Sequence, residues 1–221
     1  MLKKATLFSM IGISYIFLLR AIGTLYPQLF RKNILLVRLT ELLLFFAILS
    51  VVFFFFFFLK DYVSKGQIKL RNATILALLA FIAMLLVHLK GLIMVLNVKV
   101  FPFLSKVHSI EPIVPWINSI LITTFFIVFY KNLNRKQTIL KKSIFLAVFG
   151  SALMVFIRSL ILLNYYINAQ EVRWFADLPQ KLTFILMPIL IFNFAVILYF
   201  FFTFYKHIGL EKLNPDSVIF K

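Results

Sequence analysis

Six long apolar segments constrain this chain of 221 residues more than any other feature of its sequence. An apolar stretch of about eighteen residues or more is long enough to cross the hydrocarbon of a bilayer as a helix. The composition agrees, because 63% of residues are hydrophobic, only 14% are charged and the mean hydropathy is +1.02. We therefore predict an all-α fold, a polytopic membrane bundle of six transmembrane helices that forms a single membrane domain over residues 1–221. The predicted spans are residues 5–26, 40–59, 73–98, 113–130, 143–167 and 182–205.

The loops that separate these spans differ in positive charge. Lys and Arg number 14 in the N-terminus, residues 60–71, residues 131–142 and the tail after 205, against 7 in the three opposite loops. The positive-inside rule then places both termini in the cytoplasm, and we expect a multi-pass protein of the cell inner membrane. The net charge of +17 is explained by contacts with anionic lipids at the cytoplasmic face rather than by nucleic acid. No basic array interleaved with aromatic residues is present to bind nucleic acid.

Three spans carry a positive charge inside an otherwise apolar run, and an acid follows each one about 20 residues later. The cations are Arg20, Lys90 and Arg158, and the acids are Glu41, Glu111 and Asp177. The steps from Arg20 to Lys90 and from Glu41 to Glu111 are both 70 residues. This recurrence predicts three helical hairpins of about 70 residues, covering approximately 1–71, 72–140 and 141–207, with a cytoplasmic tail at 208–221.

These six charges are the candidate site. Arg20 follows Lys4 by 16 residues, or roughly 24 Å of helix, which puts it in the outer third of the membrane. Small residues share the helix face of each cation, and such faces are where membrane helices approach one another. The charges form either a structural layer, in which each cation pairs with the acid of its own hairpin, or the lining of a cavity for an anion or a lipid headgroup.

Other patterns are less informative. The run of six phenylalanines at 53–58 covers every face of a helix, and we interpret it as bulk that faces lipid. The three histidines, His88, His108 and His207, lie on different elements, which argues against a shared metal site. No cysteine, nucleotide-binding loop or catalytic motif is present, so we expect no cofactor and no metal.

These features favour a non-enzymatic integral membrane protein, an accessory or anchoring subunit that binds other membrane subunits of a larger assembly. The alternative is a small carrier or channel for an anion or an anionic lipid that uses the three cations. A lipid-modifying membrane enzyme is a third hypothesis, and it would need an acid or a histidine in a groove open to lipid.

Overall fold

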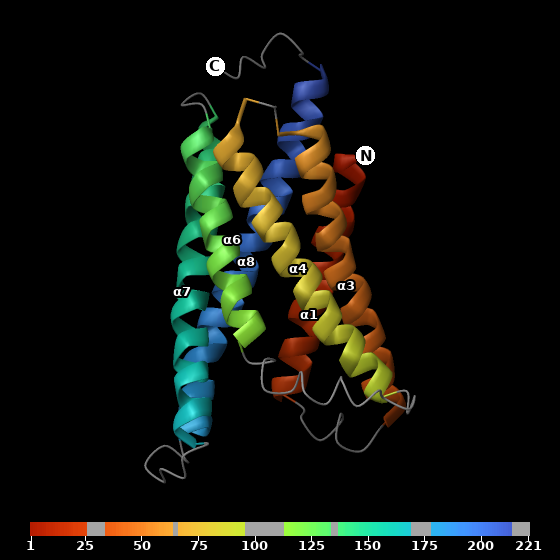
Figure 1. The fold of residues 1–221 in the computed structure, drawn as a ribbon, viewed down its shortest axis with the longest axis vertical. Helices are drawn as coiled ribbons and strands as arrows, with labels where there is room; N and C mark the ends of the chain where they lie inside the picture. The colour runs from red at the N-terminus through yellow and green to blue at the C-terminus, as the bar shows by residue number, and fades with distance from the viewer. Residues whose placement is uncertain (26–33, 64–65, 96–112, 134–136, 169–177, 214–221) are drawn as a thin grey trace.

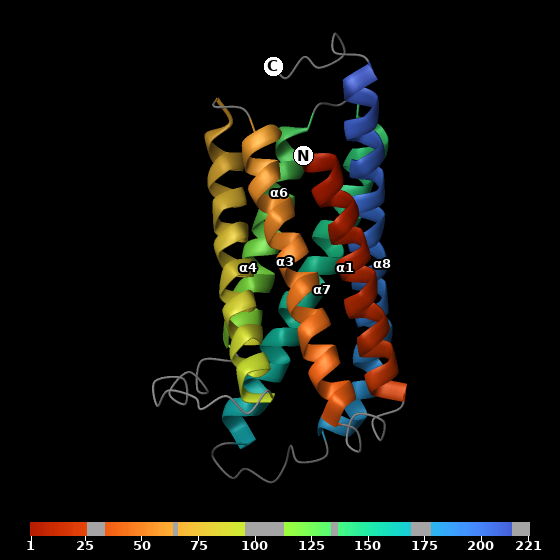
Figure 2. The same cartoon turned by 90° about the vertical axis from the view of Figure 1, so that its right-hand side faces the viewer.

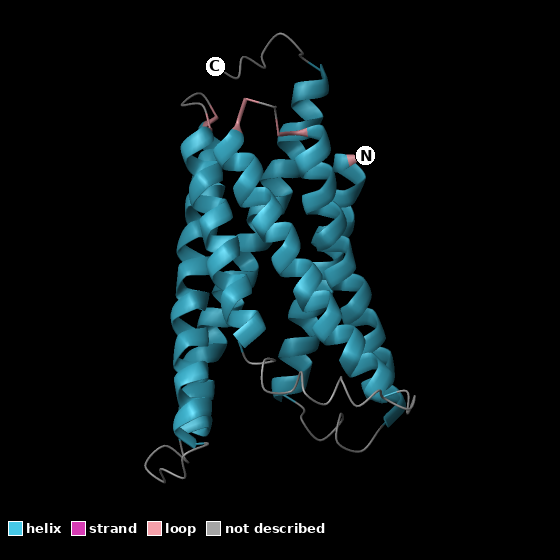
Figure 3. Cartoon of the chain, viewed as in Figure 1, coloured by secondary structure: helices cyan, strands magenta, loops and turns pink. Residues whose placement is uncertain are grey.

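The computed structural model describes residues 1–25, 34–63, 66–95, 113–133, 137–168 and 178–213. Within these ranges the chain is helical apart from a few residues next to the helix ends, with no strand (Figures 1 and 3). Six of the helices are long and apolar enough to cross a membrane, which confirms the predicted fold class. They are α1 (Leu2–Leu25), α3 (Ile34–Asp61), α4 (Ile68–Val95), α6 (Ile113–Asn132), α7 (Thr138–Asn168) and α8 (Leu178–Leu213).

Several helices are longer than the apolar spans that the sequence predicts. α3 begins at Ile34 rather than at residue 40, and α8 runs on to Leu213 rather than ending at 205. Hydropathy locates only the part of a helix that fits in hydrocarbon. The helical backbone satisfies its own N–H and C=O groups, and Leu, Lys and Arg are good helix formers, so the helices extend past the apolar limits. Pro188 lies inside α8, as the sequence predicts.

The six helices form a closed bundle (Figures 1 and 2). Each helix contacts the next one along the chain, and α8 contacts α1, which closes the ring. The three predicted hairpins correspond to α1 with α3, α4 with α6, and α7 with α8. Both α1 and α8 have their terminal ends at the same end of the bundle (Figure 1). We call this the basic end because Lys60 and Lys131 lie in the last turns of α3 and α6 there and Lys206 lies in the same part of α8. The opposite end is the far end.

The core of the basic half consists of phenylalanine. The second helix of each hairpin carries two adjacent phenylalanines and a third one turn later, and all nine side chains are at most 3% exposed. We call this set the aromatic core. Its members are Phe54, Phe55 and Phe58 of α3, Phe125, Phe126 and Phe129 of α6, and Phe200, Phe201 and Phe204 of α8.

The rings of the aromatic core interlock in a cyclic order. The ring centroids of Phe55 on α3 and Phe125 on α6 lie 5.0 Å apart, and the angle between the two ring planes is 82°. Phe126 of α6 meets Phe200 of α8 in nearly the same way, at 5.0 Å and 81°. Phe201 of α8 closes the cycle on Phe54 at 4.7 Å and 69°. Edge-to-face contacts of this kind stabilise by more than the buried area alone, so the three helices are locked together at one level.

The interpretation of the six phenylalanines at 53–58 as bulk that faces lipid is wrong for three of them. Phe53 and Phe56 are 50% and 49% exposed, whereas Phe54, Phe55 and Phe58 are buried in the aromatic core. Six consecutive positions cover every face of the helix, and α3 has neighbours on several sides. Some of the rings must therefore face protein.

Replacing a ring of the aromatic core should destabilise the bundle much more than replacing a lipid-facing ring of the same run. We expect Phe54→Ala to lower the free energy of unfolding by about 3 kcal/mol, because the neighbouring helices cannot collapse into the cavity. Phe53→Ala is the matched control and should change it little. Thermal unfolding of the purified protein in detergent measures both, and equal losses for the two variants would contradict the proposed role of the core.

Candidate functional site

The structure describes three of the six predicted charged side chains. Glu41 lies in α3, Lys90 in α4 and Arg158 in α7. Arg20 belongs to α1, but its side chain is outside the described part of the chain. Glu111 and Asp177 lie outside the described residues, and so do the predicted pairings that involve these three side chains.

Glu41 contacts the neighbouring hairpin. Its Oε2 lies 3.6 Å from His88 Nδ1 on α4, a distance that allows an ion pair with a protonated imidazole but is too long for a hydrogen bond. The same oxygen lies 3.6 Å from the position that a Cβ on Gly91 would take. The structure thus brings Glu41 against the turn of α4 that also carries Lys90. Sequence reasoning considered His88 only as a metal ligand and missed this contact.

Lys90 is buried although it belongs to a face of α4 that is otherwise open. It is 4% exposed, whereas Leu79 and Leu86, three turns and one turn before it on the same face, are 55% and 60% exposed. The expectation that Lys90 faces protein rather than lipid agrees with this burial. Lys90 does not lie on the face of α4 that packs toward the aromatic core. That face carries Thr74 and Ala77, which are fully buried and lie on the other side of the helix.

The buried face of the first helix in each hairpin begins at a leucine. Leu2, Leu70 and Leu140 are 4%, 1% and 4% exposed. Eighteen residues, or five full turns, separate these leucines from Arg20, His88 and Arg158. His88 therefore takes the position in α4 that arginine takes in α1 and α7, and Lys90 lies two residues beyond it. The spacing of the charges aligns Arg20 with Lys90, and this alignment is shifted by two residues from the one that the buried leucines give.

A signal for this register is present in the sequence. The segments LKKAT, LRNAT and LKKSI occupy residues 2–6, 70–74 and 140–144, at the start of each hairpin. Small residues recur at matching positions further along: Ser9, Ala77 and Ala147, followed by Gly12, Ala80 and Gly150.

Two of these small residues mark the closest approach within their hairpins. A Cβ on Gly12 would lie 2.9 Å from the Ala47 carbonyl oxygen on α3. A Cβ on Gly150 would lie 2.5 Å from Val196 Cγ2 and 3.1 Å from Asn193 Oδ1 on α8. Ala47 and Asn193 each precede the first aromatic-core phenylalanine of their helix by seven residues, so the two hairpins close at the same level.

Two asparagine side chains lie just beyond the aromatic core toward the far end. Asn118 is 6% exposed, and Asn193 is half-buried. Each precedes the first core phenylalanine of its helix by two turns and so shares its face. The Oδ1 atom of each is buried and accepts no hydrogen bond within the described ranges. These are acceptor atoms in the bundle interior that a donor group could satisfy.

A hydrogen bond joins the second and third hairpins beside Arg158. The Trp116 indole Nε1–H on α6 donates to Ser159 Oγ on α7 at 2.8 Å. Ser159 Oγ in turn donates to the Val155 carbonyl at 2.8 Å. The Ser159 hydroxyl is therefore fully engaged, and the contact fixes the turn of α7 that carries Arg158.

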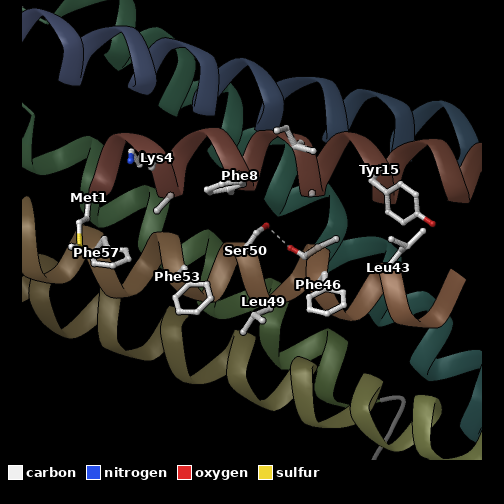
Figure 4. A pocket seen from close by; sticks show the side chains of 14 residues that line it. Met1, Lys4, Phe8, Tyr15, Leu43, Phe46, Leu49, Ser50, Phe53 and Phe57 are labelled. Carbon is white, nitrogen blue, oxygen red and sulfur yellow. Dashed lines mark hydrogen bonds between the residues drawn. The ribbon is translucent and has the colours of Figure 1, made fainter. Parts of the chain in front are cut away.

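A groove of about 750 Å³ lies between α1 and α3 on the outer surface of the bundle (Figure 4). Its lining is apolar apart from Lys4 and Met1 at one end, Tyr15 at the other, and Ser50 between them. Ser50 Oγ donates to the Ala47 carbonyl at 2.7 Å, so its hydroxyl is directed back to the helix. The described histidine and acidic side chains do not gather in threes that could hold a metal ion.

Comparison with known proteins does not relate the chain to any of them. No known family matches it, and no curated protein and no solved structure is similar to it. The function must therefore be argued from the geometry.

The contact between Glu41 and His88 can be tested by a double-mutant cycle of Glu41→Gln and His88→Gln. We expect a coupling energy of about 0.6 kcal/mol, the average for polar contacts between membrane helices, and no more than about 1.7 kcal/mol. Unfolding of the purified protein measures it. Glu41→Gln combined with His207→Gln is the control, because His207 lies at the basic end and its effect should be additive. A coupling no larger than in the control would mean that the two groups do not interact.

Proposed function

We propose that this chain is a non-enzymatic integral membrane protein that serves as an anchoring or accessory subunit of a membrane assembly. The observation that carries the proposal is the aromatic core. Nine buried rings lock one helix from each hairpin to the other two, which makes the basic half a closed and rigid body. A rigid bundle with apolar outer faces is suited to holding partner subunits in a bilayer.

The polar contacts of the far half support the same role. Glu41 and His88 link α3 to α4, and Trp116 and Ser159 link α6 to α7. Both contacts join one hairpin to the next. In a membrane, such polar contacts hold helices together where hydrophobic association is weak.

We further propose that the three hairpins are copies of one unit. The buried leucines, the small residues after them and the paired phenylalanines of the second helices recur in all three. In this view, the ring of six helices is a threefold arrangement, and the cyclic contacts of the aromatic core are its centre.

A second candidate function is a carrier for an anion, and a specific observation favours it. Arg20, His88 and Arg158 each follow a buried leucine, Leu2, Leu70 or Leu140, by five turns of helix. Asn118 and Asn193 hold buried Oδ1 atoms that accept no hydrogen bond from the described residues. A site between these two levels would hold an anionic group against the positive charge, and the two Oδ1 atoms would accept hydrogen bonds from donor groups of the same ligand.

The orientation is part of the proposal: the basic end faces the cytoplasm of the inner membrane, supported by the lysines that gather there. The chain has no cysteine, so a single one can be introduced without background. Gly66 lies in the turn between α3 and α4, where a Cβ would meet nothing within 4 Å. We expect Gly66→Cys to react with a membrane-impermeant thiol reagent in inside-out vesicles and not in intact cells. The reverse pattern would overturn the orientation.

Single cysteines also distinguish the two functions. An anchoring subunit predicts that Asn118→Cys and Asn193→Cys stay unreactive toward the same reagent from either side of the membrane and react only after denaturation. Gly66→Cys is the reactive control. Reaction of both interior cysteines from the far side alone would contradict the closed bundle and support the carrier.

The assembly itself has a direct measurement. Extracted from its native membrane in a mild detergent, the protein should run as a particle larger than one 25.9 kDa chain with its detergent. A particle of the size of one chain would contradict the anchoring role.

A further inference from the structure

The length of the groove between α1 and α3 shows how deep it reaches into the membrane. Lys4 lies at one end and Tyr15 near the other, with Leu43 facing Tyr15 from α3 (Figure 4). Eleven residues of helix separate Lys4 from Tyr15, which is roughly 16 Å. This distance is nearly equal to half the thickness of the hydrocarbon layer, which is about 30 Å. The groove therefore starts at the basic end and stops near the middle of the membrane.

The groove exists because its floor is made of small side chains. Ala5 and Gly12 of α1 face Ala47 and Ser50 of α3, and the two helices come close enough that a Cβ on Gly12 would clash. Larger apolar side chains stand beside this floor and remain open to the membrane. Phe8, Phe46 and Phe53 are 60%, 54% and 50% exposed.

The charge in the groove is placed at one end only. Lys4 is exposed and lines the groove, whereas Lys3 is directed the other way, with its Nζ 4.8 Å from the centre of the Tyr205 ring on α8. The amino group of Met1 beside it lies 3.7 Å from Asp61 Oδ2. Lys4 is thus the cation that faces a ligand in the groove, at the level where lipid headgroups begin.

We propose that this groove is a binding site for one anionic phospholipid of the leaflet that meets the basic end. An acyl chain lies along the floor between Phe8 and Phe53, and the phosphate lies against Lys4. A partner helix fits less well, because a transmembrane helix is about 30 Å long and would extend past the groove, whose lining stops at Tyr15 and Leu43. The site is independent of the anchoring role and of the interior positions.

The test is native mass spectrometry of the full chain in detergent, titrated with dioleoyl phosphatidylglycerol or dioleoyl phosphatidylcholine. We expect one phosphatidylglycerol to be retained about fivefold more tightly than phosphatidylcholine, the factor that one basic residue near an anionic lipid contributes. Lys4→Ala should abolish this preference. Lys142→Ala is the matched control, because Lys142 is an exposed lysine at the same position of α7 as Lys4 in α1 but lies outside the groove.

A second pair of variants tests the acyl-chain site. Ile11→Trp adds bulk inside the groove and should reduce retention of both lipids, whereas Leu79→Trp on the open face of α4 should not. Equal binding of the two lipids by the unmodified chain would overturn the proposal, and so would equal behaviour of Lys4→Ala and Lys142→Ala. A dimer of the chain that Ile11→Trp dissociates would show that a second copy, rather than a lipid, occupies the groove.

Discussion

The interlocking of phenylalanine rings on three helices is the interaction on which the rest of this structure depends. Inside a bilayer, lipid tails are as apolar as the side chains, so helices gain little from hydrophobic burial and must associate through close packing. The aromatic core supplies that packing at one level, through edge-to-face contacts such as Phe55 with Phe125 and Phe126 with Phe200. The first helix of each hairpin is then held against this centre by small residues such as Gly12 and Gly150.

The fold could be predicted from the sequence, because apolar length alone decides that a segment crosses a membrane as a helix. The inner and outer faces of those helices could not. In α3 the run of six phenylalanines has no periodicity, so nothing local shows that Phe54 faces protein and Phe53 faces lipid. That choice depends on which helices lie beside α3. The recurrence of paired phenylalanines in α6 and α8 was the available signal.

The candidate site was predictable in kind but not in detail. Spacing between charges selected Lys90 as the counterpart of Arg20, because both are cations in apolar runs. The register of the buried leucines selects His88 instead, because His88 lies five turns from Leu70, as Arg20 lies five turns from Leu2. The contact of Glu41 with His88 of the next hairpin follows from the closed ring, in which α3 has α4 as a neighbour as well as α1. Sequence spacing within one hairpin carries no information about that neighbour.

The closure of the ring by α8 against α1 has a consequence for biosynthesis. Phe200, Phe201 and Phe204 are supplied by α8, which follows the other five helices in the chain, so the rings of α3 and α6 gain these three partners only once α8 is in place. Until then the nascent chain exposes aromatic side chains and small-residue faces to the translocation machinery. A chain that stops short of α8 would leave Phe54 and Phe126 permanently without the rings of Phe201 and Phe200 on which they pack.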